Sequence, residues 1–345
     1  PAKQVFGKMA MPAALNSASH GFYSKGCLAG AVAMPTDGPT WQTMRLSRNR
    51  RWGHPTMVGI VEQLSIKANK SGWNGLLVGD ISQPRGGPML TGHASHQIGL
   101  DADIWFTPMP RKRMTYAERE NTSAISVLKK GSVYVDDRRW KKSYEKLLYH
   151  AASFPQVERL LVHPGIKKKL CDTVKGDRSW LNKVRPYYGH HYHFHIRIGC
   201  QPGSPNCRSQ KSTGTATGCD ASLRWWFDVA LAPKKKSKTK KPVKKKKKRI
   251  TTLSTLPAQC RTVVSAPSKP ARQAEYKAAS LSGFRAPKLN IPKKLDPLAV
   301  LSSKPIEASQ SKKFASVLKA EPVTPSTGSL FDGMRIPVPT PRPGL

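Results

Sequence analysis

The segment from Tyr192 to Ile198 alternates strictly between apolar and polar side chains. This alternation predicts a β-strand, because successive side chains of a strand point to opposite faces of a sheet. His193, His195 and Arg197 would share one face. The residues that would face the core are Tyr192, Phe194, Ile196 and Ile198. Packing does not require two imidazoles side by side, so they favour a metal or catalytic site over a solvent-facing polar edge.

A second histidine-rich segment lies upstream. His96 ends a loop rich in glycine and serine, and Asp103 follows it in a predicted strand, Leu100–Phe106. The apolar residues of that strand alternate with Asp101 and Asp103, so both carboxylates would lie on its polar face. The sequence leaves two interpretations of Asp101 open: it orients a metal ligand, or it is an exposed strand carboxylate.

Together the two segments offer a histidine from a loop, a carboxylate from a strand and a histidine from a second strand. Three such ligands leave the fourth position of a tetrahedral Zn²⁺ open for water, which is the arrangement of catalytic zinc. Neither spacing is specific by itself. Both spacings in one chain, in this order, predict a zinc site formed by His96, Asp103 and one of the two histidines His193 and His195.

Periodicity elsewhere predicts helices mixed with strands. Pro55 suits the first turn of a helix that has apolar residues at helical spacing and ends at Ser71-Gly72. Further predicted helices cover residues 144–152 and 165–171, and further predicted strands cover 76–78 and 159–162. Strands and helices do not alternate regularly, so we expect an α+β fold. Its small central antiparallel sheet would carry the zinc site, flanked by helices and loops.

Composition divides the chain into segments. All eight tryptophans and all ten histidines precede residue 233, whereas the run 234–249 contains eleven lysines and one arginine. Such a run repels itself and should be solvated and extended. The remainder is rich in Pro, Ser, Ala and Lys, which is typical of disorder. The expected segments are a loose leader at 1–20, a folded domain at 21–232, a lysine-rich linker or loop at 233–249, a short segment at 250–262 and a disordered basic tail at 263–345.

The net charge of +39 favours polyanionic partners. The lysine run would bind anionic envelope polymers, bind nucleic acid, or serve as a solvated spacer. No nucleic-acid-binding motif accompanies it, so nucleic acid is not expected. No apolar run approaches the roughly 20 residues that span a bilayer, so no membrane span is expected.

The six cysteines include no Cys-x-x-Cys pair. An even number with this spacing favours disulfides formed in an oxidising compartment, although spacing alone leaves their connectivity open. No secretory signal segment is visible in this sequence. The cysteines are therefore the main indication of export.

Five stretches resemble the penicillin-insensitive murein endopeptidases. These stretches are Met44–Arg50, Gly79–Gly87, Gly92–Ile104, Val184–Pro186 and His190–Arg197, and the resemblance runs from about Gly26 to Cys260. The wider group of zinc peptidases includes D-Ala-D-Ala carboxypeptidases, lysostaphin-type enzymes and the hedgehog domain. The resemblance implies a periplasmic zinc peptidase domain at 21–232 that cuts D-alanyl–meso-diaminopimelyl cross-links of peptidoglycan. The alternatives are a D,D- or L,D-carboxypeptidase of peptidoglycan stems and a non-catalytic wall-binding or polyanion-binding protein.

The resemblance also assigns roles to individual residues. The implied zinc ligands are His96, Asp103 and His195. His193 would be the catalytic base or would stabilise the oxyanion. His93 and His190 match histidines of the family's cleft, His93 as a further candidate ligand and His190 as a candidate proton donor.

The cysteine positions resemble the family's disulfide pattern as well. The implied pairs are Cys27–Cys260, Cys171–Cys219 and Cys200–Cys207. The first pair would tie the segment 250–262 back to the start of the domain, which would make the lysine run a loop. Separately, the guanidinium groups of Arg45 and Arg48 would hold a substrate carboxylate, or they would belong to a solvated basic loop.

Overall fold

The computed structural model describes residues 1–233 and 250–292. The lysine run at 234–249 and the tail from 293 onward lie outside the described residues. Within the described ranges the chain forms eight α-helices and eleven strands, the mixed α+β content that the sequence predicts. No helix in these ranges is long and apolar enough to cross a membrane.

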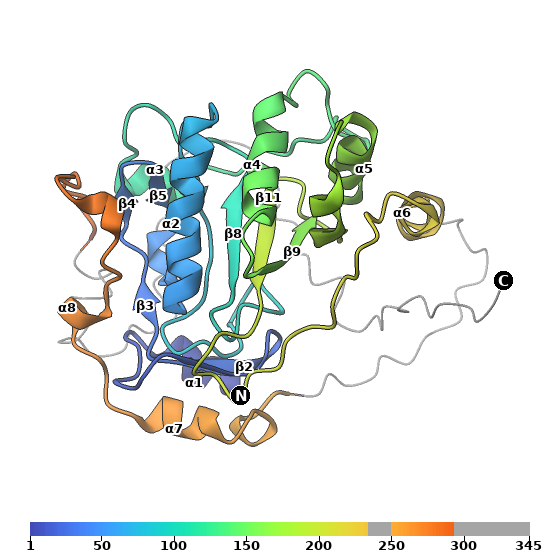
Figure 1. Ribbon diagram of the computed structural model, residues 1–345. Coiled ribbons are helices and arrows are strands. Elements are labelled where there is room, and N and C mark those ends of the chain that lie inside the picture. Colours follow the sequence, from blue (N-terminus) through green and yellow to red (C-terminus); the bar gives the residue numbers. More distant parts are fainter. Residues whose placement is uncertain (234–249, 293–345) are drawn as a thin grey trace. The chain divides into compact units, whose positions relative to one another are not determined.

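A seven-stranded sheet with the order β10-β9-β11-β8-β7-β5-β4 forms the centre of the fold (Figure 1). Its strands are β4 (Asp37–Gly38), β5 (Trp41–Thr43), β7 (Leu76–Val78), β8 (Asp101–Trp105), β9 (Val157–Val162), β10 (Val184–Pro186) and β11 (His193–Ile198). The central strands β9, β11, β8 and β7 pair antiparallel, as expected.

The expectation of a small, wholly antiparallel sheet is wrong toward the edges. There β5 pairs parallel with β7, and β10 pairs parallel with β9. Each parallel pair is joined by a crossover helix, α2 (Pro55–Lys70) in the first case and α5 (Pro164–Thr173) in the second. A helix that returns the chain across the sheet lets the next strand run in the same direction. The sheet is therefore mixed.

Helices α2, α4 and α5 lie on one face of the sheet (Figure 1). Helix α2 begins as predicted, because Pro55 occupies its first turn and the side chain of His54 accepts a hydrogen bond from the Thr56 amide. It ends before Gly72, whose φ of +89° a residue with a Cβ rarely adopts. The remaining helices are α1 (Ala2–Gly7), α3 (Tyr116–Asn121), α4 (Lys142–Ala152), α6 (Ala221–Trp225), α7 (Gln259–Ser265) and α8 (Ala271–Ala274).

Strand β11 separates the core from the polar face, as its alternation predicts. Phe194, Ile196 and Ile198 are fully buried in the main hydrophobic core. The alternate residues of the strand point to the opposite face of the sheet. Tyr192, which the pattern places in the core, is instead 38% exposed, because β11 begins only at His193. The strand thus presents its two histidines on the face away from the core.

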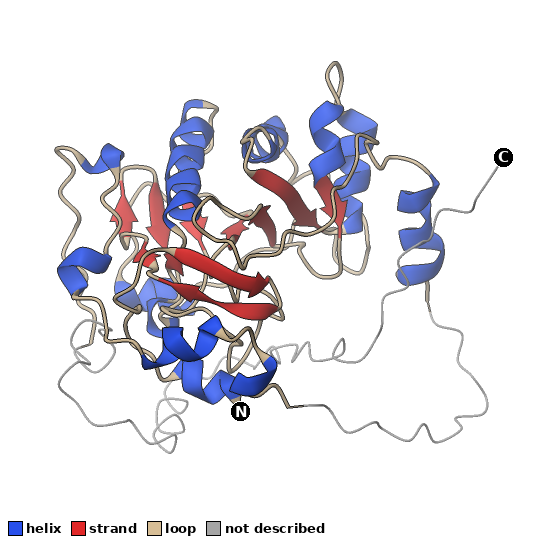
Figure 2. Cartoon of the chain, turned by 60° about the horizontal axis from the view of Figure 1, so that its bottom comes forward, coloured by secondary structure: helices blue, strands red, loops and turns tan. Residues whose placement is uncertain are grey.

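Two small antiparallel ribbons accompany the sheet (Figure 2). Their strands are β1 (Ala18–Phe22) with β2 (Lys25–Ala29), and β3 (Val32–Ala33) with β6 (Trp52–Gly53). The expectation of a loose leader at 1–20 is wrong, since α1 buries Ala2 and Phe6 in a cluster with α7. Apolar side chains at the start of the chain become buried because a distant segment packs against them.

That distant segment follows the lysine run. The Ala2 amide donates to the Thr251 carbonyl, and the buried Arg85 donates to the carbonyls of Val263 and Ala266. The prediction that the chain is disordered from residue 263 onward is therefore wrong for residues 263–292, which the structure describes. The buried guanidinium of Arg85 needs these carbonyls as acceptors, so the segment packs on the domain.

All six cysteines form disulfides, in the pairing that the resemblance implies. The pairs are Cys27–Cys260, Cys171–Cys219 and Cys200–Cys207. The first joins β2 to α7 across a sequence separation of 233 residues. The described residues on both sides of the lysine run, up to Pro233 and from Thr251, therefore belong to one compact unit.

Candidate metal centre

Three side chains from separate parts of the chain converge on the polar face of the sheet. His195 of β11 and Asp103 of β8 are directly paired across neighbouring strands. The Asp103 Oδ1 atom lies 3.1 Å from His195 Nδ1 and 3.4 Å from His96 Nε2. The two imidazole nitrogens lie 3.1 Å apart. Strand pairing thus sets two of these groups, and a loop brings the third.

The outer nitrogen of each histidine is already engaged. His96 Nδ1 lies 2.6 Å from the Ile81 carbonyl, and His195 Nε2 lies 2.9 Å from the Asp101 carboxylate. Each of these nitrogens donates its proton to an oxygen, so the inner nitrogen keeps its lone pair. Asp103 Oδ1 is buried and accepts no hydrogen bond within the described residues. With both histidines neutral, all three inner atoms therefore have lone pairs available to a shared metal ion.

This donor set fits a divalent metal ion. Zinc binds nitrogen and oxygen at about 2.0–2.2 Å with tetrahedral geometry, which separates neighbouring ligand atoms by about 3.4 Å. Burial disfavours the protonated form of His96, but the charges of Asp103 and Asp101 raise its pKa to about 9. The carboxylates thus create a site that favours positive charge. A metal ion supplies such charge.

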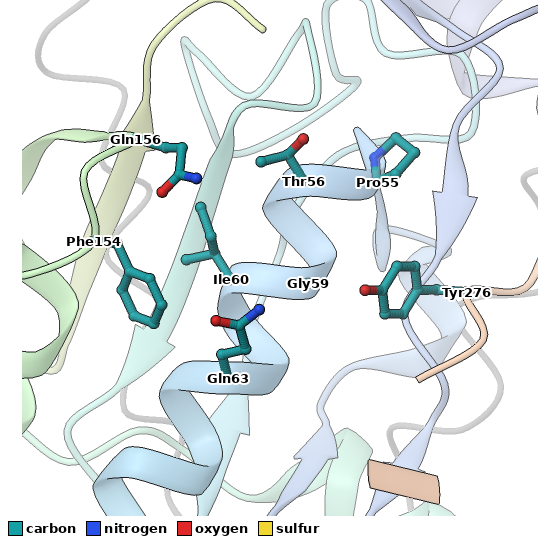
Figure 3. Close-up of a pocket in the computed structure, with 8 residues that line it drawn as sticks. All are labelled: Pro55, Thr56, Gly59, Ile60, Gln63, Phe154, Gln156 and Tyr276. Carbon is teal, nitrogen blue, oxygen red and sulfur yellow. The ribbon is translucent and has the colours of Figure 1, made fainter. Parts of the chain in front are cut away.

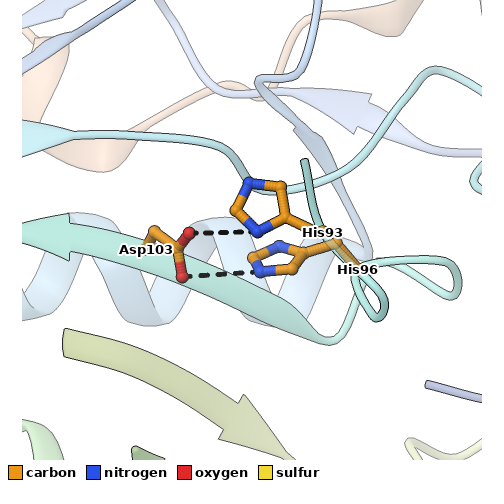
Figure 4. A group of neighbouring side chains, drawn as sticks. All are labelled: His93, His96 and Asp103. Carbon is orange, nitrogen blue, oxygen red and sulfur yellow. Dashed lines mark ion pairs between the residues drawn. The ribbon is translucent and has the colours of Figure 1, made fainter. Parts of the chain in front are cut away.

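His93 lies at the open side of the same cluster. Its ring and that of His96 both face the carboxylate of Asp103 (Figure 4), with His93 Nδ1 3.5 Å from Asp103 Oδ2. One ligand atom from each of the three residues lies within 4.8 Å of the others, so this group could also bind a metal ion. The contact of His93 is longer than those that join His96, Asp103 and His195.

The two remaining candidate histidines border the cluster. His193 Nε2 lies 3.6 Å from Asp103 Oδ2, and burial lowers the pKa of His193 to about 4. His190 donates from Nδ1 to the Tyr188 carbonyl, and burial lowers its pKa to about 3. The rings of His190 and His193 are 4.8 Å apart. Both are therefore neutral near pH 7, with a nitrogen able to accept a proton.

Asp101 is fully buried, which excludes its interpretation as an exposed strand carboxylate. Its oxygens accept hydrogen bonds from the backbone amide of His96 and from the side chains of His195 and Arg197. One carboxylate therefore orients two of the candidate ligands, His195 through its ring and His96 through its backbone.

The backbone at His96 and His190 is unusual. Both residues have positive φ, +64° and +53°, in the left-handed region that side chains with a Cβ avoid. Such conformations persist where the surrounding contacts over-determine them, and they concentrate at functional sites. At His96 the hydrogen bond from its amide to Asp101 supplies one such contact.

Asp80 is a residue that the sequence reasoning missed. Its Oδ2 accepts hydrogen bonds from His93 Nε2, Arg50 and Arg48. Burial opposes its charge, but these three partners hold the pKa of Asp80 well below its usual range. The available signal was its position directly after the predicted strand 76–78, where it meets the centre of the sheet.

The structure separates the two arginine candidates. The Arg48 side chain is 47% exposed and reaches the cluster through Asp80, which also binds His93. Arg45 instead donates to the carbonyl of Thr122. Arg48 is thus linked to the cluster by a shared carboxylate, and Arg45 bonds to the backbone of a neighbouring loop.

A hollow of about 300 Å³ lies over helix α2 (Figure 3). It is lined by Pro55, Thr56, Gly59, Ile60, Gln63, Phe154, Gln156 and Tyr276. None of the candidate metal ligands lines it. Since α2 covers the face of the sheet opposite the histidines, this hollow is separate from the candidate metal centre.

The sequence of this chain is similar to those of known proteins. The sequence profile described as penicillin-insensitive murein endopeptidase matches residues 19–265. The protein of that description from Haemophilus influenzae is 41% identical over 224 residues, which cover 64% of this chain and 76% of the relative. The one from Klebsiella pneumoniae is 37% identical over 221 residues, 64% of this chain and 80% of the relative. One from Escherichia coli is 36% identical over 257 residues, 74% of this chain and 89% of the relative.

Proposed function

This chain belongs to the penicillin-insensitive murein endopeptidase family, a family of peptidases that hydrolyse peptidoglycan cross-links, and we propose that it does so with Zn²⁺ held by His96, Asp103 and His195. The observation that carries the proposal is the mutual separation of 3.1–3.4 Å between the inner atoms of these residues. The buried Asp103 Oδ1 atom, which has no hydrogen-bond donor among the described residues, supports it further.

When bound at such a centre, zinc supplies Lewis acidity at its remaining coordination position. The residues of the chain do the rest of the work. Asp101 holds the His195 ring with Nδ1 turned inward, and the Ile81 carbonyl holds the His96 ring with Nε2 turned inward. Neither ring must reorganise when substrate arrives, which is the advantage of a preorganised site.

His193 is the proposed general base. It is neutral near pH 7 and its Nε2 faces the Asp103 carboxylate, so it can take a proton from the attacking water. Once protonated, it can stabilise the oxyanion of the tetrahedral intermediate. His190 is the proposed proton donor to the leaving amine. While its Nδ1 donates to the Tyr188 carbonyl its Nε2 carries no proton, so Nε2 would first take the proton that the neighbouring His193 removed from the water and then pass it to the amine.

His93 keeps a proposed role beside the ligands. Its Nε2 donates a hydrogen bond to Asp80, so its Nδ1 keeps a lone pair that faces Asp103 and the proposed metal position. It therefore acts as a further ligand or as a hydrogen-bond acceptor for the attacking water. Arg48, exposed beside this pair, is the proposed contact for a substrate carboxylate, with Arg45 behind it in the same loop.

The proposed substrate bond is the D-alanyl–meso-diaminopimelyl cross-link. Three disulfides support an oxidising compartment of the cell envelope, the periplasm. The proposed role of the lysine run is to attract anionic envelope polymers, since its charge acts at a distance whatever its conformation. A D,D- or L,D-carboxypeptidase activity is the enzymatic alternative, and a non-catalytic wall-binding protein is the alternative of another class.

Digestion of cross-linked sacculi, with and without a zinc chelator, tests the proposal. We expect chelator-sensitive conversion of dimeric to monomeric muropeptides with intact stem termini, identified by mass spectrometry. Loss of terminal D-Ala alone would indicate a carboxypeptidase. Binding to sacculi without any product would indicate the non-catalytic alternative.

Variants separate the assigned roles. His195→Ala should lose both zinc and activity, whereas His193→Ala should retain zinc and lose about 10²–10⁴-fold in kcat, the range for general acid–base catalysis. His150→Ala, which removes a histidine bonded to Ser71 on the helix face of the sheet, is the matched control. Full activity of His193→Ala would show that His193 is not the base.

A further inference from the structure

The face of the sheet that carries the metal centre also carries two arginines toward the β10 edge. His195 pairs with Leu161 of β9, and Leu161 pairs with Arg185 of β10. Directly opposed residues of paired strands lie on one face, so Arg185 stands in the same row as His195 and Asp103. Neighbouring strands lie about 4.8 Å apart, which places the backbone of Arg185 about 10 Å from that of His195.

The next row of the same face contains the second arginine. Arg197 pairs with Asp101 on one side and with Arg159 on the other. The Nη2 atom of Arg159 donates to the Lys211 carbonyl. Its Nη1 atom is buried and has no hydrogen-bond partner within the described residues. Buried donors without acceptors are rare, so this atom indicates an absent acceptor.

Arg185 also lacks a partner among the described residues. Its guanidinium, with Nη1 beside Gly218, forms no hydrogen bond or ion pair in the part of the chain that the structure describes, and the residue is partly exposed. Arg197, by contrast, is paired with both oxygens of Asp101. Of the three arginines that the structure describes in these two rows, Arg185 is therefore the one that is both accessible and free to bind a ligand.

The electrostatics of the pair favour an anion. Burial lowers the pKa of Arg159, and the charges of Arg197 and Arg185 lower it further, whereas the charge of Glu158 raises it. Burial likewise lowers the pKa of Arg185, whereas the charge of Asp220 raises it. Among described residues neither acid lies within ion-pair distance of these guanidinium groups, and Asp220 caps helix α6 through Ser222 instead. Positive charge is thus incompletely neutralised beside the metal centre.

We propose that Arg185, with the positive charge of Arg159 in the neighbouring row, binds a free carboxylate of the stem peptide next to the scissile bond. A planar guanidinium matches the two oxygens of a carboxylate, which favours this ligand over a neutral amide. Leu161, between Arg185 and His195, gives an apolar floor for the carbon chain that links carboxylate and scissile bond. The proposal rests on the proposed function, because it concerns the substrate of that reaction.

The test compares two soluble cross-linked muropeptide dimers, one with free carboxylates and one with these carboxylates amidated. We expect the zinc-loaded full chain to cleave the free acid with a kcat/KM roughly 10- to 100-fold higher, the factor that a hydrogen bond to a charged group supplies. Arg185→Gln should remove this preference, mainly through a higher KM for the free acid, so that the two dimers are cleaved with similar kcat/KM. Arg185→Lys should restore part of the preference.

Controls make the outcomes distinct. Arg111→Gln removes an exposed arginine without changing this face, and it should keep the wild-type preference. An equal loss on both dimers in Arg185→Gln, with zinc content retained, would mean that Arg185 is only structural. Equal cleavage of both dimers by the wild type would overturn the carboxylate proposal alone. Cleavage of neither dimer by the zinc-loaded wild type would instead contradict the proposed endopeptidase function.

Discussion

Asp101 shows how a single residue holds the metal centre without belonging to the proposed ligands. It accepts hydrogen bonds from the ring of His195, the backbone of His96 and the guanidinium of Arg197. Arg197 also lies over the ring of Tyr23, 4.0 Å from its centroid. These contacts fix which nitrogen of His195 faces the candidate metal site, and partners of this kind strengthen metal affinity.

The variant Asp101→Asn tests this role. We expect the zinc affinity to fall about 10- to 100-fold, because the amide weakens the bonds to His195 and Arg197. Competition with a chromophoric chelator measures the affinity. The exposed Asp172→Asn is the control, since Asp172 pairs only with Lys168 on the surface of α5 among the described residues. An unchanged affinity in Asp101→Asn would rule out the orienting role.

Lys167 is a fully buried lysine whose Nζ donates to the carbonyls of Leu181 and Thr217. Burial, and then the charge of Arg185, lowers its pKa to about 7. In the unfolded chain the pKa returns to about 10.4. Between these values the unfolded state binds the proton and the folded state does not, so the stability rises with pH.

We therefore expect the free energy of unfolding to gain up to about 1.4 kcal/mol per pH unit from Lys167 between pH 7 and 10. Denaturant titrations across this range measure the slope. Lys167→Met should lower this slope relative to the wild type, and Lys168→Met, an exposed neighbour on α5, should not. In the metal-free protein His96, with its pKa raised to about 9, contributes a slope of opposite sign up to about pH 9 in all three proteins, so the comparison between them isolates Lys167. The same slope in Lys167→Met and wild type would refute the assignment. The buried His54 and His163, with pKa values lowered to about 4, act only below this range.

At the scale of elements, the segment after the lysine run completes the fold. Helix α7 is joined to β2 by Cys27–Cys260, and its last carbonyls accept hydrogen bonds from Arg85. Arg85 follows Asp80 in the loop that leads to His93 and His96. The packing of α7 thus supports the loop that carries two of the candidate metal-site histidines.

Removal of this disulfide by Cys27→Ala/Cys260→Ala should destabilise the domain by about 2–5 kcal/mol, since it closes a long loop of chain. Chemical denaturation of the oxidised proteins measures the loss. The double variant Cys200→Ala/Cys207→Ala removes a disulfide that joins residues only 7 apart in the sequence, so its loss of stability should be smaller. An equal or smaller loss for the Cys27/Cys260 variant would contradict this reasoning.

At the scale of the whole molecule, charge is the dominant property. The chain carries a net charge of +39, and the lysine run contributes twelve of its basic residues. Such a charge attracts anionic polymers over distances of about one Debye length, roughly 10 Å at 0.1 M salt. Attraction to the wall should therefore be separable from the chemistry at the metal centre.

Binding to sacculi should weaken strongly between about 0.05 and 0.5 M NaCl, as charge interactions are screened. Replacement of the eleven lysines at 234–249 by serine should reproduce this loss at low salt and leave hydrolysis of soluble dimers unchanged. Sedimentation with sacculi measures binding. Salt-independent binding, or loss of dimer hydrolysis in the serine variant, would contradict the separation.

How far the sequence predicts this protein depends on the range of the interactions involved. Alternation in 192–198 predicts β11 and its two faces to within one residue, because a strand's pattern is written in consecutive residues. Helix α2 is predicted for the same reason, with Pro55 at its start. Both elements depend on local periodicity, which a sequence states directly.

Tertiary structure alone decides which of these elements meet. The pairing of His195 with Asp103, the hydrogen bonds of Asp80 and the row that ends at Arg185 join residues far apart in the chain. The crossovers that make the sheet mixed, and the packing of residues 1–20 against α7, also depend on distant partners. By itself the sequence determined the candidate metal ligands and the local elements. The geometry of the candidate ligands was determined by the folding of the whole chain around one core. Only that folding brings polar groups from distant parts of the sequence together in a buried site.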